Sequence, residues 1–395
     1  MEQVSIALCS SYEQSGVRRA MVDLLAPLGG MGAFILPGDR VLLKPNLLSA
    51  KAPDAAVTTH PAIVMAVAEL VQEAGGIVLI GDSPGIGSFR TVAAKSGIAA
   101  AAEAAGAELV EFDNPVEICA EGTFRRIKVA RAYWEADKII NLPKLKTHEM
   151  MTMTCAVKNL FGAVVGAQKA AWHLAAGESR QLFARLLLEI YLLKRPVLTI
   201  VDAVVAMEGD GPGSGDPVAL GMLLAGANAL SVDVIAGRAA GIPPDLLHVE
   251  QEALRLEIEG SRAADIELVG ASLGGFGHRP FRLPTGLSAS FGLPEFLRRL
   301  LKRHLTPQPS ADQKRCVLCG ICRDACPPGV IEIKNSALTI DHGRCIHCWC
   351  CRELCPHHAM LAERGALLRV LSALPFGRKG SGQASSSSEP RGISR

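Results

Sequence analysis

The sequence has no apolar run long enough to cross a membrane. Its longest candidate, residues 217–232, lies between Asp216 and Asp233 and is shorter than the roughly 20 residues that a membrane-spanning helix needs. The N-terminus also has no basic segment followed by an uninterrupted apolar stretch, which an export signal requires. We therefore expect no transmembrane segment, and we expect the protein to be cytoplasmic.

The sequence also has little net charge. Its 41 Lys and Arg residues against 39 Asp and Glu residues give a formal charge of +2, so no overall field holds a nucleic-acid backbone. We expect no nucleic-acid partner, and any basic site must be local. Of the 395 residues, 20% are charged and 49% are apolar, which excludes extensive disorder and predicts two or three folded domains.

Two common nucleotide-binding motifs are missing. The sequence has no G-x-x-x-x-G-K, and no G-x-G-x-x-G follows its first predicted strand, so nucleotide triphosphate hydrolysis and an ordinary dinucleotide-binding fold lose their main support. Other modes of binding those cofactors stay open. Residues 81–85 match the G-x-S-x-G elbow of α/β hydrolases, but that elbow needs a backbone N–H after the Ser, and Pro84 has none. A hydrolase is therefore disfavoured.

Residues 1–285 alternate short β-branched or apolar runs with Ala-rich helical patterns. This alternation predicts a three-layer α/β domain, in which helices cover a mostly parallel sheet. The predicted strands are residues 4–8, 40–43, 77–80, 138–141, 197–201 and 220–225. The predicted helices include residues 61–73, 178–193 and 229–240. The first of these helices begins with a Pro and is followed by two Gly residues, as helices often are.

The pattern changes after residue 285. Residues 286–310 place Pro, Gly and Ser around a basic helical segment at 295–304, and we interpret them as a basic connector. A compact Cys-rich module follows at residues 311–362. Residues 363–395 form a C-terminal tail whose last part is rich in Ser, Gly and Arg, which predicts that the tail is mostly disordered.

Eight of the 12 Cys residues form a duplicated motif within this module. The motif C-x2-C-x2-C-x3-C-P occurs twice, and its repetition is the signature of a bacterial two-cluster ferredoxin, in which the fourth Cys of each run binds the other cluster. The predicted ligands of the first 4Fe-4S cluster are Cys316, Cys319, Cys322 and Cys355. Those of the second are Cys345, Cys348, Cys351 and Cys326. We expect a small α+β ferredoxin-like fold with a hairpin formed by residues 330–333 and 338–341.

Zinc is the alternative, because C-x2-C pairs also bind zinc. Zinc explains neither the third Cys of each run nor the Cys-Pro endings, so the pattern favours iron-sulfur clusters. Cys350 is one Cys more than the pattern uses, and we interpret it as a packed or exposed thiol rather than a ligand. Cys9, Cys119 and Cys155 are interpreted as small apolar residues.

Four polar stretches of the α/β region each follow a predicted strand, where open α/β sheets form their ligand crevice. They are residues 44–47 with 58–61, residues 81–85, residues 141–148 leading to 158–162, and Asp202 with residues 208–212. Together they resemble the family called domain of unknown function 362, over residues from about 4 to 245. Fusion to a two-cluster ferredoxin module also occurs in that family. The resemblance implies an iron-sulfur cluster-binding protein but no established reaction.

Four Lys residues in these stretches point to a site for a small anionic ligand. Lys44, Lys144, Lys146 and Lys158 lie at predicted strand ends or helix starts. Ammonium groups there, assisted by helix N-termini, suit a phosphate or carboxylate group. The alternative is four solvated lysines in salt bridges. His60 and His148 could move protons near neutral pH, although a structural role for each stays open.

Four carboxylates in the same stretches allow a second interpretation. Asp82, Asp202, Glu208 and Asp210 could hold a hard cation that bridges to an anionic ligand. Residues 208–216 are also what a turn with positive φ would contain, and they lack the spacing of an EF-hand. The pattern favours the turn.

Two functions follow from these features. The first is an iron-sulfur oxidoreductase, in which a partner protein donates or accepts electrons through two clusters, and a ligand or cofactor on the α/β domain exchanges them. In this scheme Lys44, Asp82, Lys144 and Lys158 bind the anion, and Lys146, His148 and His60 serve catalysis. A flavin would suit such chemistry, but no flavin motif is visible. The alternative is an electron carrier, redox sensor or accessory binding protein that serves a partner enzyme.

Overall fold

The computed structural model describes all residues except 167, 178, 274–278, 285–306 and 364–395. Residues 1–287 and 308–363 belong to one compact unit. The predicted helix at residues 295–304 and almost all of the predicted disordered tail lie outside the described residues. Within the described part, no helix has both the length and the apolar character that crossing a bilayer requires.

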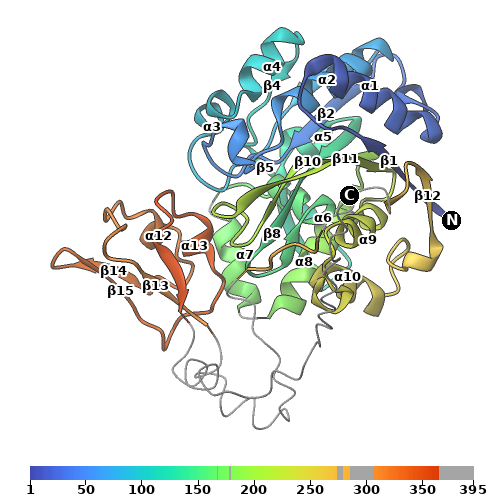
Figure 1. The fold of residues 1–395 in the computed structure, drawn as a ribbon. Helices are drawn as coiled ribbons and strands as arrows, with labels where there is room; N and C mark the ends of the chain where they lie inside the picture. Colours follow the sequence, from blue (N-terminus) through green and yellow to red (C-terminus); the bar gives the residue numbers. More distant parts are fainter. Residues whose placement is uncertain (167, 178, 274–278, 285–306, 364–395) are drawn as a thin grey trace, which may run out of the picture. The chain divides into compact units, whose positions relative to one another are not determined.

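A ten-stranded sheet forms the centre of the α/β part (Figure 1). Its main path runs β12 (Ile266–Gly270), β1 (Glu2–Leu8), β11 (Asp216–Gly226), β10 (Leu198–Glu208), β7 (Lys138–Leu142), β2 (Arg40–Pro45), β3 (Ile77–Ile80) and β4 (Glu108–Leu109). Two further strands, β8 (Lys144–His148) and β9 (Thr152–Thr154), extend from β10. Most strand pairs are parallel, while β11 is antiparallel to both of its neighbours. The predicted mostly parallel sheet is confirmed.

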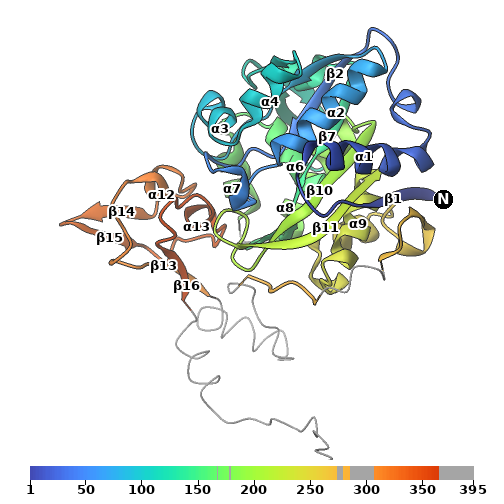
Figure 2. The same cartoon turned by 45° about the horizontal axis from the view of Figure 1, so that its top comes forward.

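Helices cover both faces of this sheet, as Figures 1 and 2 show. One layer contains α1 (Gln14–Leu25), α2 (Pro61–Glu73), α3 (Phe89–Lys95) and α4 (Ile98–Ala104). The other contains α5 (Arg131–Glu135), α6 (Ala156–Asn159), α7 (Gln168–Ala176), α8 (Arg180–Leu193), α9 (Ala229–Ala239) and α10 (His248–Arg255). Side chains alternate along a strand, so Val41 and Leu43 of β2 enter one core and Leu42 enters the other. Burial on both faces gives the three layers predicted from the sequence.

The predicted elements match the observed ones closely where apolar residues dominate. The helix at 61–73 and the strand at 77–80 have the predicted bounds. β10 and β11 are longer than predicted, at 11 residues each. Strand β8 was not predicted, because Lys144–His148 reads as a polar segment, yet all five residues are buried. The hairpin of β5 (Pro115–Cys119) and β6 (Arg126–Ala130) was also not predicted.

The Cys-rich module is built from two small antiparallel sheets and two short helices. β13 (Gln308–Ala311) pairs with β16 (Met360–Glu363), so a strand begins inside the segment interpreted as a connector. β14 (Ile331–Lys334) pairs with β15 (Ala337–Ile340), which confirms the predicted hairpin. The helices are α12 (Ile321–Asp324) and α13 (Cys350–Glu353). The core of the module is small, and two of its six buried residues are Cys322 and Cys351.

Candidate functional site

A cavity of about 410 Å³ lies at the ends of several strands. Residues that follow β2 and β3 line it, together with residues of β8, β9, α6 and α7. Its polar lining from the α/β part includes Asn46, Asp82, Ser83, Lys146, Thr154, Lys158, Asn159, Lys169 and His173. The module contributes Asp324, Ala325, Cys350, Glu353 and Leu354. The cavity thus joins the predicted lysine-rich stretches to segments that flank the duplicated Cys motif.

Lys146 reaches this cavity from the buried strand β8. Its ammonium donates hydrogen bonds to the side-chain oxygen of Asn46 and to the carbonyl of Val57, both at 2.7 Å. Neither acceptor is charged. Burial lowers the pKa of Lys146 to about 7, against the attraction of the Glu353 carboxylate. At neutral pH this group therefore exchanges its proton readily, and its third N–H direction is available to a ligand.

Lys158 is the least satisfied of the lysines at the cavity. It makes no hydrogen bond or ion pair with any other residue that the structure describes. Burial lowers its pKa, and the charge of Glu353 opposes that shift. The neighbouring Asn159 is fixed, since its amide donates to Lys44 O at 3.2 Å and to Asn141 Oδ1 at 2.9 Å. Helix α6 thus presents to the cavity an ammonium that has no partner within the described part of the chain.

Lys169 and Lys44 complete the cationic side of the site. Lys169 on α7 donates hydrogen bonds to the Ser83 carbonyl, to Ser83 Oγ at 3.0 Å and to the Pro84 carbonyl at 3.1 Å. Burial lowers the pKa of Lys169 to about 8. Lys44 instead forms a buried ion pair, 2.7 Å from Asp82. Asp82 lines the cavity, but its charge is matched by Lys44.

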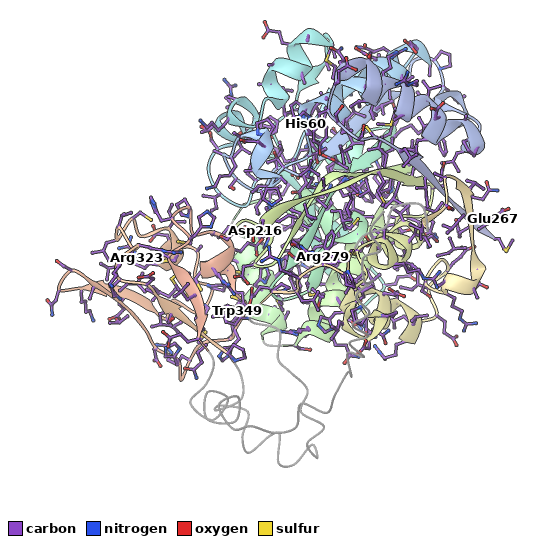
Figure 3. The ribbon with its side chains drawn as sticks, in the orientation of Figure 1. His60, Asp216, Glu267, Arg279, Arg323 and Trp349 are labelled. Atoms are coloured by element: carbon purple, nitrogen blue, oxygen red, sulfur yellow. The ribbon has the colours of Figure 1, made fainter. Side chains whose placement is uncertain are left out.

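Lys144 and His60 lie in a separate polar network and are not among the residues that line the cavity. Lys144 pairs with Asp202 at 2.8 Å and donates to the hydroxyl of Tyr12 at the same distance. The Tyr12 ring stacks on His60, with 3.5 Å between ring centroids. His60 (Figure 3) also caps α2, because its Nδ1 accepts from the Ala62 amide at 3.2 Å. Burial lowers the pKa of His60 to about 4.

His148 is fully buried and contacts the cavity through Glu353. Its Nδ1 accepts hydrogen bonds from the Met150 and Met151 amides at 3.0 and 3.1 Å, so the ring proton lies on Nε2, 3.5 Å from Glu353. Burial, followed by the charge of Lys158, lowers the pKa of His148 to about 4. Burial alone would raise the pKa of Glu353, but His148 and then Lys158 outweigh it and hold this pKa well below its usual range.

Two other buried polar side chains at the cavity have no hydrogen-bond partner among the described residues. His173 is 6% exposed, and its ring stacks on Phe183 with 4.3 Å between centroids. Thr154 is 3% exposed, and its Oγ1 is equally unpaired. Thr154 lies opposite Lys146 in the pairing of β8 with β9. Buried polar groups are nearly always hydrogen-bonded, so these two groups are available to form hydrogen bonds with a polar molecule in the cavity.

The acidic turn pairs with arginines. Glu208 lies 2.5 Å from Arg279 Nη2 and 2.8 Å from Arg282 Nε; Figure 3 labels Arg279. The hydrogen bond from Arg279 is the main reason that the pKa of Glu208 falls to about 2. Asp210 lies 2.6 Å from Arg352. Each of the four carboxylates considered for a cation therefore has a basic partner, which agrees with the turn interpretation.

The eight Cys sulfurs of the duplicated motif gather in two groups. A small hollow is lined by Cys316, Cys319, Cys322 and Cys355. Burial raises the pKa of Cys322 to about 11, and the next contribution is the charge of Cys355. Burial is the main cause that raises the pKa of Cys351, and the charges of Cys348, Cys345, Cys322 and Cys326 raise it further, in that order. The fourth Cys of each run thus lies near the first three of the other run, as cluster ligation requires.

Backbone amides add to this arrangement. The amides of Val330, His347 and Ala359 donate to the sulfurs of Cys326, Cys345 and Cys355 at 3.4, 3.5 and 3.3 Å. Such N–H···S bonds stabilise thiolates and tune cluster potentials. The donor set and its environment therefore fit 4Fe-4S chemistry.

The module is held against the α/β part by a buried arginine and a tryptophan. Arg352 is 7% exposed and lies 2.8 Å from Glu149 and 2.6 Å from Asp210. Trp349, labelled in Figure 3, is 3% exposed and belongs to the hydrophobic core that α8 and α9 share. These contacts come from the second Cys run, so the same segment that carries Cys348 and Cys351 also closes the cavity.

Sequence reasoning missed several residues of the cavity. Glu353, Lys169 and His173 were not predicted, because none belongs to a recognisable motif. Cys350 was noted only as a surplus thiol, yet it lines the cavity and is 7% exposed. Its position beside Cys351 was the sequence feature that could have placed it near the cluster ligands. The others became visible only when α7 and the second Cys run met at the same cavity.

The fold and the site define a class of protein: a three-layer α/β domain joined to a 4Fe-4S module. The chain belongs to the family described as domain of unknown function (DUF362), whose sequence profile matches residues 41–238. A 4Fe-4S dicluster domain matches residues 315–359. The protein is therefore an iron-sulfur protein of the 4Fe-4S type, and the predicted combination of the two domains is confirmed.

Two known proteins are similar to the chain. The thylakoid-associated protein sll1697 of Synechocystis sp. is 43% identical over 235 residues, which is 60% of this chain and 73% of the relative. The structure of the lactate racemase apoprotein from Thermoanaerobacterium thermosaccharolyticum has a TM-score of 0.41 and 13% identity. That match covers 61% of this chain and 58% of the racemase chain.

Proposed function

We propose that the protein is an iron-sulfur oxidoreductase that exchanges electrons between a partner protein and a small organic anion held in the lysine-lined cavity. One observation carries the proposal: the same cavity is lined by Lys146 and Lys158 from the α/β part and by residues adjacent to the cluster Cys, such as Cys350 and Leu354. A ligand bound there is close to the electron source. Tethering of this kind favours transfer to that ligand over other acceptors.

In the proposed module, two 4Fe-4S clusters transfer electrons one at a time. Cys316, Cys319, Cys322 and Cys355 hold one cluster, and Cys345, Cys348, Cys351 and Cys326 hold the other. The grouping of these sulfurs supports this assignment. Cys319 is exposed to solvent, so an electron donor or acceptor protein has access to the first cluster from outside.

The lysines bind the anion in this proposal. Lys158 has no partner among the described residues, and Lys146 is hydrogen-bonded only to uncharged acceptors. Asp82 is already matched by Lys44. A carboxylate or phosphate would therefore gain charge-assisted hydrogen bonds there. A flavin phosphate belongs to the same class of anion and is one candidate cofactor.

Lys146 also suits proton transfer. Its pKa of about 7 lets it give and regain a proton near neutral pH, as general acids do. His148 does not contact the anion in this proposal; its Nε2 faces Glu353 and orients that carboxylate. Lys144 and His60 have a structural role in this proposal, since they are bound to Asp202 and Tyr12 away from the cavity.

Replacing Lys158 tests the anion site. Lys158→Gln removes the unpaired ammonium, so we expect the affinity for 3-phenylpropionate, a simple organic anion, to fall about tenfold or more. Calorimetry on the anaerobically purified full-length protein measures this affinity. The matched control is Lys128→Gln, a substitution at a side chain that is 48% exposed on β6, and it should bind as the unchanged protein does. Equal affinity of Lys158→Gln and the control would contradict the anion site.

Two further measurements test the assigned chemistry. Native mass spectrometry of the same protein weighs the clusters and any retained ligand together, and we expect two 4Fe-4S clusters with an organic anion or cofactor. The chemically reduced protein should then be reoxidised by that small molecule with no partner protein present. Reoxidation only by a partner protein would favour an electron carrier or redox sensor instead.

A further inference from the structure

The proposed function leaves His173 without a role. No sequence motif selects this residue, which lies on α7 and lines the cavity. It is 6% exposed, and its buried Nδ1 makes no hydrogen bond to any residue that the structure describes. An imidazole that only filled space in a core would lose hydrogen bonds to water without replacement, at a cost comparable to a buried unpaired polar group.

The rings around His173 show that an apolar side chain would fit in its place. His173 stacks on Phe183 at an interplanar angle of 25°, and it meets the edge of Phe161, with 5.7 Å between centroids. Both phenylalanines are buried in the same hydrophobic core. A Phe at position 173 would suit these neighbours better than a His. Packing against these two rings therefore does not account for the ring nitrogens of His173. Their position at the cavity does.

The charge distribution indicates which part of a ligand meets His173. Glu353 is the strongest charged influence on His173, followed by Lys158. Burial lowers the pKa of His173 to about 3, so the ring is neutral at pH 7. A neutral ring beside a carboxylate is a poor site for a second negative charge. An uncharged oxygen is a suitable partner, because a neutral imidazole donates through one nitrogen.

We infer that His173 is a ligand-binding residue that hydrogen-bonds an uncharged oxygen, a carbonyl or hydroxyl, of the organic anion whose charged group Lys158 holds. The inference rests on the proposed anion site and narrows its ligand to an oxygen-bearing organic acid. Thr154, which is also unpaired and lies beside Lys146, would hydrogen-bond the charged end. Two matched acids that differ only by one oxygen therefore distinguish the role of His173 from that of the lysines.

The test compares phenylpyruvate with 3-phenylpropionate, which has two hydrogens in place of the oxo oxygen. We expect the unchanged holoprotein to bind phenylpyruvate about fivefold to tenfold more tightly, the contribution of one buried hydrogen bond. In His173→Phe this preference should disappear, while 3-phenylpropionate still binds and the thermal unfolding temperature does not fall. His173→Gln, which keeps donor and acceptor groups, should retain part of the preference. His248→Phe, at a half-buried His outside the cavity, is the control.

Each outcome bears on a different claim. Equal binding of the two acids by the unchanged protein would overturn the role of His173 and leave the anion site standing. A His173→Phe protein that loses the preference but also unfolds at a much lower temperature would assign His173 to structure and overturn the inference. If neither acid binds the unchanged protein, the proposed anion site fails and the inference fails with it.

Discussion

At the scale of single residues, the interior lysines fall into two kinds. Lys44 and Lys144 each form an ion pair with a buried carboxylate, at 2.7 and 2.8 Å. Lys146, Lys158 and Lys169 lack such a partner among the described residues and all line the cavity. The Glu353 carboxylate attracts Lys146 and Lys158, but burial outweighs this attraction and lowers the pKa of both. Lysines of the first kind are explained by the fold alone, and those of the second kind are the ones to which we assign the proposed anion.

The pH dependence of stability tests the burial of Lys146. Its pKa in the folded protein is lowered from 10.5 to about 7, so between pH 7 and pH 10 the unfolded chain binds more protons there than the folded protein does. Lys146 therefore destabilises the fold at neutral pH, and this cost disappears as the pH rises. Relative to Lys146→Met, the unchanged protein should gain at least a few degrees in unfolding temperature from pH 7 to pH 10.

The comparison uses thermal unfolding of both proteins under anaerobic conditions. Lys138→Met, at the half-buried start of β7, controls for the loss of a lysine elsewhere in the same sheet and should show no such trend. An unfolding difference between Lys146→Met and the unchanged protein that stays constant over this pH range would contradict the lowered pKa.

At the scale of elements, the second Cys run both carries predicted cluster ligands and contacts the α/β part. Its helix α13 carries Cys350, Cys351 and Glu353, and its Arg352 reaches across to Glu149 and Asp210. Gly213 allows this close approach, because a Cβ there would lie 2.8 Å from the Glu353 carbonyl oxygen, whereas Gly211 packs against Thr147 within the α/β part. The glycine-rich turn thus serves the contact between the module and the α/β part.

Removing Arg352 tests this contact. Arg352→Met leaves Glu149 and Asp210 buried or half-buried without this cation, and breaking a buried ion pair costs about 3–5 kcal/mol. We expect the free energy of unfolding to fall by a similar amount in chemical denaturation. Arg131→Met breaks an exposed pair with Glu135 and should cost less than about 0.5 kcal/mol. Similar losses in the two variants would show that Arg352 does not hold the module.

At the scale of the whole molecule, the two parts differ in what stabilises them. The α/β part has a core on each side of its sheet. The core cluster of the module has six buried residues, of which two are Cys. Small domains with such cores depend on metal centres for stability. Removal of the iron should therefore destabilise the module more than it destabilises the α/β part.

Iron removal tests this difference. After chelation of iron under anaerobic conditions, we expect hydrogen exchange to speed up across residues 312–362, while β2, β7 and β10 stay protected. Mass spectrometry of peptide fragments measures this exchange, and reconstitution with iron and sulfide should restore protection. Loss of protection throughout the sheet would mean that the two parts unfold as one, and unchanged exchange in the module would mean that its small core suffices.

Much of the fold follows from local sequence patterns. Apolar runs such as Ile77–Ile80 and the helix Pro61–Glu73 have the bounds that their periodicity predicts, because each element buries its own apolar face. Strand β8 was not predicted because its side chains are polar, and its burial depends on tertiary contacts that include pairing with β10 and β9. The antiparallel direction of β11 was likewise not visible in a pattern that alternates strands with helices.

The sequence by itself determined the iron-sulfur chemistry and the class of the fold, because Cys spacing and apolar periodicity are local properties of the chain. Tertiary structure decided the rest of the site. It separated Lys144 and His60 from Lys146 and Lys158, although all four lie in similar motifs. It also brought His173 and Glu353, 180 residues apart in sequence, to one cavity. Which polar groups are paired, and which remain for a ligand, depends on contacts between distant segments, and no local pattern encodes those contacts.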